Sequence, residues 1–378
     1  MDRPRPLRTD GSNAFARFSM QTRVPEIARA VAAQSPSGAA TRARIERLAA
    51  EIEGDAALPA PQGPAPDLEA WQRSHAEHEG ETWLGTEWFH AELAFYFELA
   101  RASRFWESGR DPFASVKGDE LAEQRPWQRL AQALAIGGSR EERMHGLVEA
   151  ALWGNRVDLS YTVAAERTQT EGDLLVDDRS RALPWLAAPG ARVHLVADNA
   201  GTELALDLAL AAAVLEDPAA QVAVHLKVQP IFVSDAMVSD FWQLLERMRD
   251  AGAGPRRLAG ALVERFEEGR LTLAPDPFWS SPRFLWRAPT HLRDALASAS
   301  VVLVKGDANY RRIVGDALWP PATPFRKACG YLGAPVVCLR TMKSDPVLGL
   351  PPGLGETLDA AEPTWRIDGR RGVIQAAG

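Results

Sequence analysis

Cysteine is scarce in this sequence, and basic residues are outnumbered by acidic ones. Cys329 and Cys338 are the only two cysteines among 378 residues, and the formal net charge is −7. Two cysteines are too few for a disulfide framework or a cysteine-rich zinc site. Without a surplus of basic residues to neutralise phosphates, a general nucleic-acid binder is disfavoured, although a local positive pocket can still bind a small anion.

Long hydrophobic runs are missing as well. The longest one, residues 204–215, contains Asp207 and is too short to span a bilayer. The first ten residues lack the apolar core that a secretory signal requires. The chain is 46% hydrophobic and 25% charged, as ordinary globular proteins are. We therefore expect a cytoplasmic protein that binds neither membranes nor nucleic acid.

Three common catalytic motifs are also absent. The sequence contains no phosphate-binding loop of the G-x-x-x-x-G-K-[ST] type, no H-E-x-x-H zinc motif and no G-x-S-x-G nucleophile motif. A catalytic site must therefore be sought in the way polar residues are distributed along the expected helices and strands.

The first part of the chain has the pattern of helices. Apolar residues recur at helical spacing, for example at Val24, Ile27 and Val31, and no convincing strand pattern occurs up to about residue 156. A strongly apolar helix is expected over residues 83–106. Glu92 in this helix could face either solvent or a ligand pocket, and the sequence leaves both alternatives open.

Beyond residue 183, four short β-branched runs alternate with helical segments. This alternation is typical of a parallel sheet whose two faces are covered by helices. The gap at residues 270–287 is rich in proline and aromatic residues, and it suggests an irregular insertion. The expected strands are residues 193–197, 222–228, 301–304 and 336–339.

Polar side chains gather at the carboxyl ends of all four expected strands. In open parallel sheets, ligands bind outside these ends. Asp198 and Asn199 follow the first strand and Asp235 comes after the second, although a βα turn and a helix cap are ordinary explanations for such residues. The third and fourth strands are followed by Lys305, Asp307, Asn309, Arg340 and Lys343.

The combined set indicates a site of mixed charge. The oxygen atoms of Asp198, Asn199 and Asp235 suit Mg²⁺, Mn²⁺ or a similar divalent ion. The cations after the last two strands can clamp a phosphoryl group. A metal ion and cations around one phosphate form the recurring arrangement for phosphoryl transfer to water. A turn, a cap or a solvated side chain explains any one residue equally well, but the coincidence at four strand ends favours a site.

Five stretches, in order along the chain, resemble the metal-dependent damage-control phosphatases formerly grouped as domain of unknown function 89. The resemblance extends over nearly the whole chain and is closest to the branch that includes the acidic-residue methyltransferase-like proteins. The chain departs from the family pattern at Ile231, where an aromatic residue is usual, and over residues 111–127. The five stretches are residues 152–160, 198–203, 227–235, 305–312 and 339–345.

The resemblance implies an α/β fold with the site at a domain interface. A helical N-terminal domain, residues 1–160, would pack on a three-layer α/β/α sandwich, residues 161–378, with a mostly parallel sheet. One divalent ion, usually Mn²⁺, Co²⁺ or Ni²⁺ with Mg²⁺ as a further candidate, would be held by Asp198, Asn199 and Asp235. The other implied site residues are Lys343, which is catalytic, Arg340, Lys305 and Asn309 on the phosphate side, and Arg23, Glu92 and Asp158 near the sugar.

The activity that the resemblance implies is hydrolysis of a small sugar phosphate, of the fructose or hexose phosphate type, or of a related damaged phosphometabolite. Either a metal-activated water or Asp198 itself would attack phosphorus, although Ala200 stands where aspartyl-phosphate phosphatases carry their general acid. The alternative is an S-adenosylmethionine-dependent protein-glutamate O-methyltransferase, which is disfavoured because the first βα turn contains a single glycine, Gly201. A non-catalytic sugar-phosphate-binding protein is the third alternative.

Overall fold

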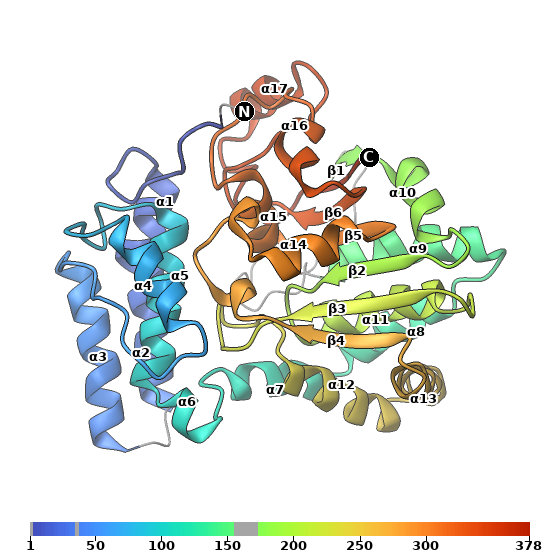
Figure 1. Ribbon diagram of the computed structural model, residues 1–378, viewed down its shortest axis with the longest axis horizontal. Coiled ribbons are helices and arrows are strands. Elements are labelled where there is room, and N and C mark those ends of the chain that lie inside the picture. Colours follow the sequence, from blue (N-terminus) through green and yellow to red (C-terminus); the bar gives the residue numbers. More distant parts are fainter. Residues whose placement is uncertain (1–2, 35–37, 155–172) are drawn as a thin grey trace.

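Seven strands form one sheet in the part of the chain that the structure describes. The structure is a computed structural model, and it describes residues 3–34, 38–154 and 173–378. The strands lie in the order β1-β7-β6-β5-β2-β3-β4, and neighbours are parallel except for β6 and β7 (Figure 1). Their bounds are β1 (Leu174–Asp177), β2 (Arg192–Val196), β3 (Gln221–Leu226), β4 (Leu271–Pro275), β5 (Val301–Lys305), β6 (Val336–Thr341) and β7 (Gly372–Ala377).

The four expected strands are β2, β3, β5 and β6, at the centre of the sheet. They are largely buried, which explains their continuous apolar runs. The sequence pattern did not predict β1, β4 and β7. The expectation of an irregular insertion at residues 270–287 is wrong for its first part, because β4 is an edge strand of the sheet. Two 3₁₀ helices follow it, η3 (Pro277–Ser280) and η4 (Leu285–Arg287).

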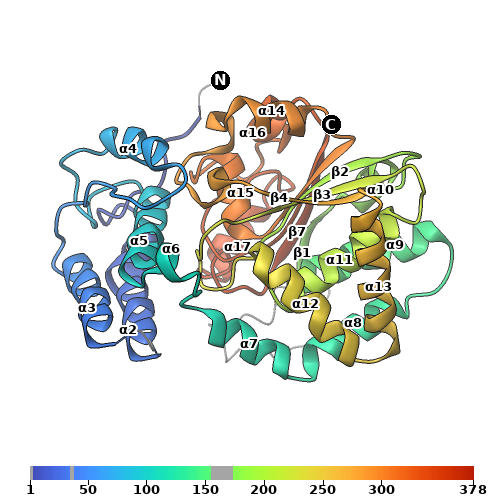
Figure 2. The ribbon, with the colours of Figure 1, turned by 60° about the horizontal axis from the view of Figure 1, so that its bottom comes forward.

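Helices cover both faces of the sheet (Figure 2). On one face, Leu195 and Leu303 share a core with Leu208. On the other, Val302 shares a core with Ile313. The predicted three-layer α/β/α arrangement is therefore confirmed. The first face carries α8 (Arg125–Leu134), α9 (Arg140–Trp153), α10 (Arg179–Leu186), α11 (Thr202–Val214), α12 (Val238–Asp250) and α13 (Ala253–Glu267), and the second carries α14 (Thr290–Ala297), α15 (Asp307–Val314) and α16 (Arg326–Cys329).

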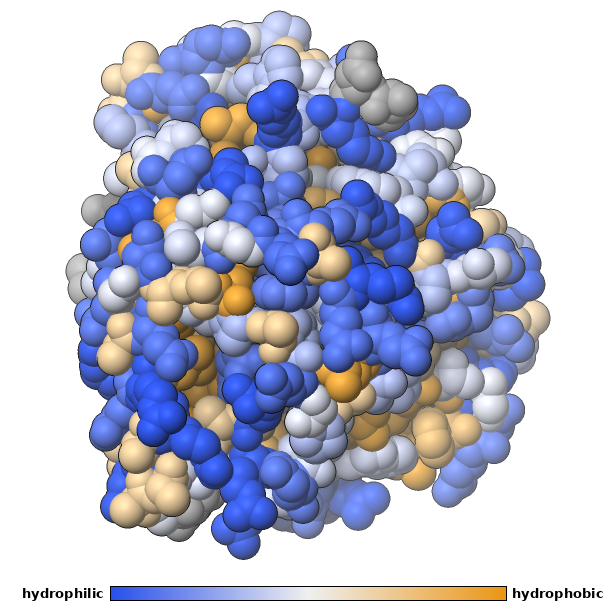
Figure 3. Space-filling view, turned by 60° about the vertical axis from the view of Figure 1, so that its left-hand side comes forward, coloured by the Kyte–Doolittle hydropathy of each residue, from blue (hydrophilic) through white to orange (hydrophobic). Residues whose placement is uncertain are grey.

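The first helices form what we call the helical lobe, α1 to α6, beside the remainder, which we call the sheet domain (Figure 1). The lobe has its own core, and Ile231 and Phe284 of the sheet domain belong to that core as well. The outward face of the lobe is largely hydrophilic (Figure 3). The lobe contains α1 (Ala14–Phe18), a π-helical turn η1 (Ser19–Arg23), α2 (Val24–Gln34), α3 (Ala39–Glu53), α4 (Leu68–Ala76), α5 (Trp88–Ala102) and α6 (Phe105–Ser108).

The domain boundary expected at residue 160 falls outside the described residues and stays a prediction. Helices α8 and α9, which precede it, pack on α11, so they belong to the helical layer of the sheet domain. Helix α7 (Ala114–Ala122) leads to them from the lobe. In the described ranges, no helix combines the length and apolarity needed to cross a membrane.

Leu303 lies at the centre of the sheet and is 2% exposed. We expect Leu303→Ala to lower the free energy of unfolding by about 2–5 kcal/mol, because it leaves a cavity in the core. Leu318→Ala, at a residue that is 50% exposed, is the control and should change this free energy by less than about 0.5 kcal/mol. Denaturant unfolding measures both, and equal losses would contradict the central position of β5.

Candidate active site

Two loops at the carboxyl edge of the sheet are tied together through their backbones. One follows β2 and carries Asp198 and Asn199, and the other follows β3 and carries Asp235. The Ala236 N–H donates a hydrogen bond to the Asp198 carbonyl at 2.8 Å. Asn199 and Asp235 pair as an antiparallel bridge. The three predicted metal ligands therefore start from neighbouring backbone positions, although they are far apart in sequence.

Asp235 does not cap the helix that follows it. The N-cap of α12 is Met237, whose N–H donates to the Asp240 carboxylate at 2.8 Å. Asp235 is instead 1% exposed, and its Oδ2 lies 3.1 Å from Lys227 Nζ. Its burial beside a second acidic loop favours a role in a site over the ordinary cap.

Asn199 is fixed by hydrogen bonds at both ends of its amide. Its Nδ2 donates to Asp198 Oδ2 at 3.0 Å and to Glu203 Oε2 at 2.9 Å. The Ser234 hydroxyl donates to Asn199 Oδ1 at 2.6 Å. The amide is therefore held with its NH₂ group toward Asp198 and Glu203 and its oxygen toward Ser234.

Asp198 and Asp235 form a buried pair of carboxylates. Burial raises the pKa of Asp198 well above its ordinary value, and the charges of Asp235 and Glu203 raise it further against the opposing effect of Lys227 and Lys343. Two buried carboxylates beside an amide match the oxygen ligands of a hard divalent cation, whose charge would offset their repulsion. The two carboxylates thus fit the metal ion that the resemblance implies, and Asn199 would join them by turning its oxygen from Ser234 toward Asp198.

A cavity opens in front of these carboxylates, between the helical lobe and the sheet domain. Arg23 and Glu92 reach it from η1 and α5 of the lobe, and Lys343 reaches it from the loop after β6. Asp158, which the resemblance also implies, lies outside the described residues. The described lining consists of Phe15, Arg23, Trp88, Glu92, Asp198, Asn199, Phe232, Asp235, Asp307, Ala308, Arg311 and Lys343.

The described lining does not include Lys305, Asn309 or Arg340, so their positions do not support the predicted direct contacts with substrate. Lys305 is fully buried behind the cavity wall. Its Nζ lies 2.8 Å from Glu203 Oε1 and 2.7 Å from Asp207 Oδ1. Lys305 therefore holds Glu203, which in turn accepts a hydrogen bond from the Asn199 amide.

Asn309 and Arg340 also have protein partners. Asn309 Nδ2 donates to the Ala197 carbonyl at 3.1 Å and therefore holds the end of β2. Arg340 Nε donates to Asp307 Oδ1 at 2.7 Å, and its Nη2 donates to the Ser344 carbonyl at 2.8 Å. These contacts fix the cavity wall at Asp307 and the loop after β6, which carries Lys343.

Sequence reasoning missed Arg311, and it counted Asp307 among the polar residues at the third strand end without giving it a role in the site. Arg311 lies with its guanidinium 3.7 Å from the Trp88 ring centroid, and its Nη1 donates to Glu92 Oε2 at 2.6 Å. Burial works against ionisation of Asp307, but Arg340 and Arg311 outweigh it and lower the pKa of this carboxyl. The sequence signal for Arg311 was its position two residues after Asn309, within the helix that begins at the third strand end.

The N-terminus of α11, directly after the Asp198 loop, is occupied by an acid of the chain itself. Glu120 Oε1 accepts hydrogen bonds from the Thr202 N–H at 2.9 Å and the Thr202 hydroxyl at 2.6 Å. A Cβ on Gly201 would lie 2.1 Å from Glu120 Oε2. This first βα turn is therefore filled by Glu120, and an anionic ligand is not accommodated there without moving it.

The model of the damage-control phosphatase ARMT1-like domain matches residues 19–358 of this chain. The chain belongs to this family. The damage-control phosphatases ARMT1 of Mus musculus and Xenopus laevis are 31% and 30% identical to it, over 80% and 79% of this chain and 77% of each relative. A DUF89 family protein from Pyrococcus horikoshii shares the fold, with a TM-score of 0.51 over 95% of this chain and 97% of that chain at 15% identity.

These similarities confirm the resemblance found in the sequence. They also confirm the predicted enzyme class, since damage-control phosphatases are hydrolases of phosphate esters. In this family member, the cavity brings together an acidic cluster from the sheet domain and charged side chains from both parts of the molecule.

Gly306 makes room for the Asp198 carboxylate. Its φ is +79°, and a Cβ there would lie 1.9 Å from Asp198 Oδ2. We expect Gly306→Ala to displace this carboxylate and to weaken Mn²⁺ binding at least about tenfold, by analogy with changes next to metal ligands. The measurement is a calorimetric Mn²⁺ titration.

The control is Gly353→Ala. Gly353 has a similar φ of +80° at a helix N-cap, but a Cβ there has no neighbour within 4 Å. This variant should bind Mn²⁺ as the wild type does. A left-handed alanine should lower only its free energy of unfolding, by about 1–2 kcal/mol. Wild-type Mn²⁺ affinity in Gly306→Ala would contradict the tight fit at Asp198.

Proposed function

We propose that this chain is a metal-dependent phosphatase that hydrolyses small sugar phosphates, of the fructose or hexose phosphate type, or related damaged phosphometabolites. The observation that carries the proposal is the buried pair Asp198 and Asp235, with Asn199 beside them, at the inner end of a cavity that Lys343 also lines. A metal site and a cation at one cavity suit the charge of a phosphoryl group.

Asp198, Asn199 and Asp235 would hold the metal ion, for which Mn²⁺, Co²⁺, Ni²⁺ and Mg²⁺ are the candidates. When bound, such an ion polarises phosphoryl oxygens and lowers the pKa of a water molecule. Lys343 would stabilise the negative charge that the phosphoryl oxygens carry in the transition state. Lys227, which lies 3.1 Å from Asp235 Oδ2, keeps that carboxylate in place.

The helical lobe would recognise the rest of the substrate. Glu92 accepts a hydrogen bond from the Ser19 hydroxyl through Oε1 and pairs with Arg311 through Oε2, so its carboxylate is rigidly held at the cavity. Arg23 and Trp88 line the same side. A carboxylate, a guanidinium and an aromatic face together suit the hydroxyl groups and apolar face of a sugar.

The cavity as it stands has a volume of about 70 Å³, which is less than the several hundred Å³ usual for a site that encloses a whole ligand. The proposal therefore requires the helical lobe and the sheet domain to separate around a hexose phosphate. Such a motion would widen the cavity and break the pair between Glu92 of the lobe and Arg311 of the sheet domain, which would free both side chains for the substrate.

Attack by a water molecule is favoured over a covalent route through Asp198, because Ala200 offers no general acid two residues further on. Methyl transfer is disfavoured, since Glu120 fills the βα turn at Gly201 where a methyl donor would be expected.

A phosphatase assay over a panel of sugar phosphates, with Mn²⁺ and with a chelator, tests the proposal. We expect hydrolysis that the chelator abolishes and that Asp198→Ala lowers about a hundredfold or more, because loss of a ligand removes the metal. Asp294→Ala, at an exposed residue of α14, is the control and should match the wild type. Activity that survives both chelation and Asp198→Ala would refute the metal-dependent mechanism.

Lys343 allows the phosphate side to be tested separately from the metal ligands. We expect Lys343→Met to lower kcat/KM about a hundredfold, the effect typical of losing one group that stabilises transition-state charge, while Mn²⁺ affinity changes little. Lys327→Met, at an exposed lysine, should leave both quantities unchanged. Steady-state kinetics and Mn²⁺ calorimetry make the comparison, and unchanged kcat/KM in Lys343→Met would remove this residue from the mechanism.

A further inference from the structure

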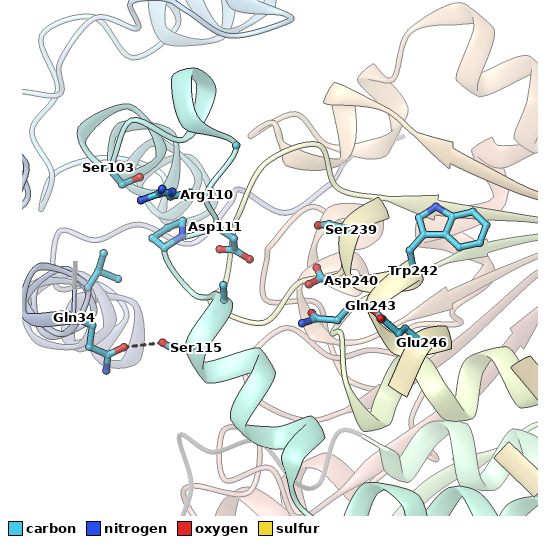
Figure 4. Close-up of a pocket in the computed structure, with 14 residues that line it drawn as sticks. Gln34, Ser103, Arg110, Asp111, Ser115, Ser239, Asp240, Trp242, Gln243 and Glu246 are labelled. Carbon is cyan, nitrogen blue, oxygen red and sulfur yellow. Dashed lines mark hydrogen bonds between the residues drawn. The ribbon is translucent and has the colours of Figure 1, made fainter. Parts of the chain in front are cut away.

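A second cavity, of about 770 Å³, lies between the helical lobe and α12 of the sheet domain (Figure 4). Among the described residues, it shares no lining residue with the candidate active site. Asp111, from the segment that leaves the lobe, and Asp240, from α12, point toward one another at its inner wall (Figure 4).

A buried lysine connects this inner wall to the candidate metal site. Lys117 of α7 is 4% exposed, and its Nζ lies 2.9 Å from Asp111 Oδ2 and 2.8 Å from Asp240 Oδ2. The same ammonium donates a hydrogen bond to the backbone carbonyl of Asp235 at 2.9 Å. Burial disfavours the charged form, but Asp240 and Asp111 outweigh it and raise the pKa of Lys117.

We propose that Lys117 is a positioning residue for the metal site, which fixes the backbone of Asp235 so that the Asp235 carboxylate faces Asp198. This inference rests on the proposed metal-dependent function. Lys117 and Lys227 hold the same residue in different ways: Lys227 lies beside the carboxylate, whereas Lys117 binds the carbonyl.

The loop that carries Asp235 needs such a restraint because its backbone is strained. Phe232 and Val233 have φ values of +47° and +70°, and such left-handed conformations cost about 1–2 kcal/mol at each non-glycine residue. The Phe232 ring packs on Tyr96 of the lobe, with ring centroids 5.3 Å apart. At the other end of this loop, Lys117 supplies a side-chain hydrogen bond to the Asp235 carbonyl.

The segment before Lys117 also belongs to the packing between lobe and sheet domain. Phe113 lies in the core of the lobe, 6.2 Å from Tyr96 between ring centroids. The Phe113 N–H donates to Asp111 Oδ1 at 2.8 Å, and Oδ2 of the same carboxylate faces Lys117. The position of Asp235 is therefore coupled to the way the lobe sits on the sheet domain.

The test compares Lys117→Met with wild type by calorimetric titration with Mn²⁺ alone. We expect the Kd for Mn²⁺ to rise about 10–100-fold, the range found when a group that orients a metal ligand is removed. Hydrogen exchange of the metal-free protein should also become faster at residues 231–237, because the loop loses its restraint. Asp111→Asn, which keeps the contacts of Lys117 with Asp240 and with the Asp235 carbonyl, should have a smaller effect of the same kind.

Arg140→Met is the matched control, because Arg140 also holds backbone carbonyls, those of Ala187, Ala213 and Val214, at a place far from the site. It should leave the Mn²⁺ affinity and the exchange at residues 231–237 unchanged. Wild-type Mn²⁺ affinity in Lys117→Met would overturn the inference.

Failure of the proposed function gives a different result, because the wild type itself would then bind no Mn²⁺. In that case the role of Lys117 is decided by hydrogen exchange. Faster exchange at residues 231–237 in Lys117→Met, but not in Arg140→Met, would support its hold on the loop, and unchanged exchange would overturn it.

Discussion

The backbone pairing between the loops after β2 and β3 is the constraint on which the rest of the site depends. The hydrogen bonds from Ala236 to Asp198 and from Ala200 to Ser234 fix two segments that are more than thirty residues apart. As a consequence of this pairing, the carboxylates of Asp198 and Asp235 are buried together, and burial and the charge of Asp235 raise the pKa of Asp198. A bound cation would relieve this repulsion. Much of the surrounding structure holds the two carboxylates in place for it.

That support comes from cations that do not reach the cavity. Lys305 pairs with Glu203 and Asp207, Arg340 pairs with Asp307, and Lys117 pairs with Asp111 and Asp240. Removing one member of a buried ion pair is far more disruptive than losing a surface pair, because the remaining charge is left without compensation. The buried cations therefore contribute to the geometry of the acidic cluster, while Arg23, Arg311 and Lys343 are the cations that the described lining of the cavity contains.

Much of this arrangement could be predicted from the sequence, because central parallel strands have a simple signature. The strands β2, β3, β5 and β6 are largely buried on both faces, so they appear as continuous apolar runs. The edge strand β4 has half-exposed residues and no such run, and the prolines and aromatic residues in and after it indicate an irregular insertion instead. The rule that ligands bind at the carboxyl ends points to Asp198, Asn199 and Asp235, which the structure brings together at this edge, while their binding role stays a prediction.

The orientation of the individual cations could not be predicted in the same way. A lysine at a strand end faces the cavity or the core depending on acids that only the fold brings near it, as Glu203 and Asp207 are brought to Lys305. Arg311 was missed for the converse reason, since its partners Glu92 and Trp88 come from the lobe, more than two hundred residues earlier. Lys117 depends likewise on Asp240, which is remote in sequence.

The most direct test of the central claim is the stoichiometry of Mn²⁺ binding, measured by calorimetry on the wild type and on Asp235→Asn. Two carboxylates and one amide at a single pair of loops predict one ion per chain in the wild type and severely weakened binding in the variant. An absence of binding to the wild type, or unchanged binding to Asp235→Asn, would contradict the account.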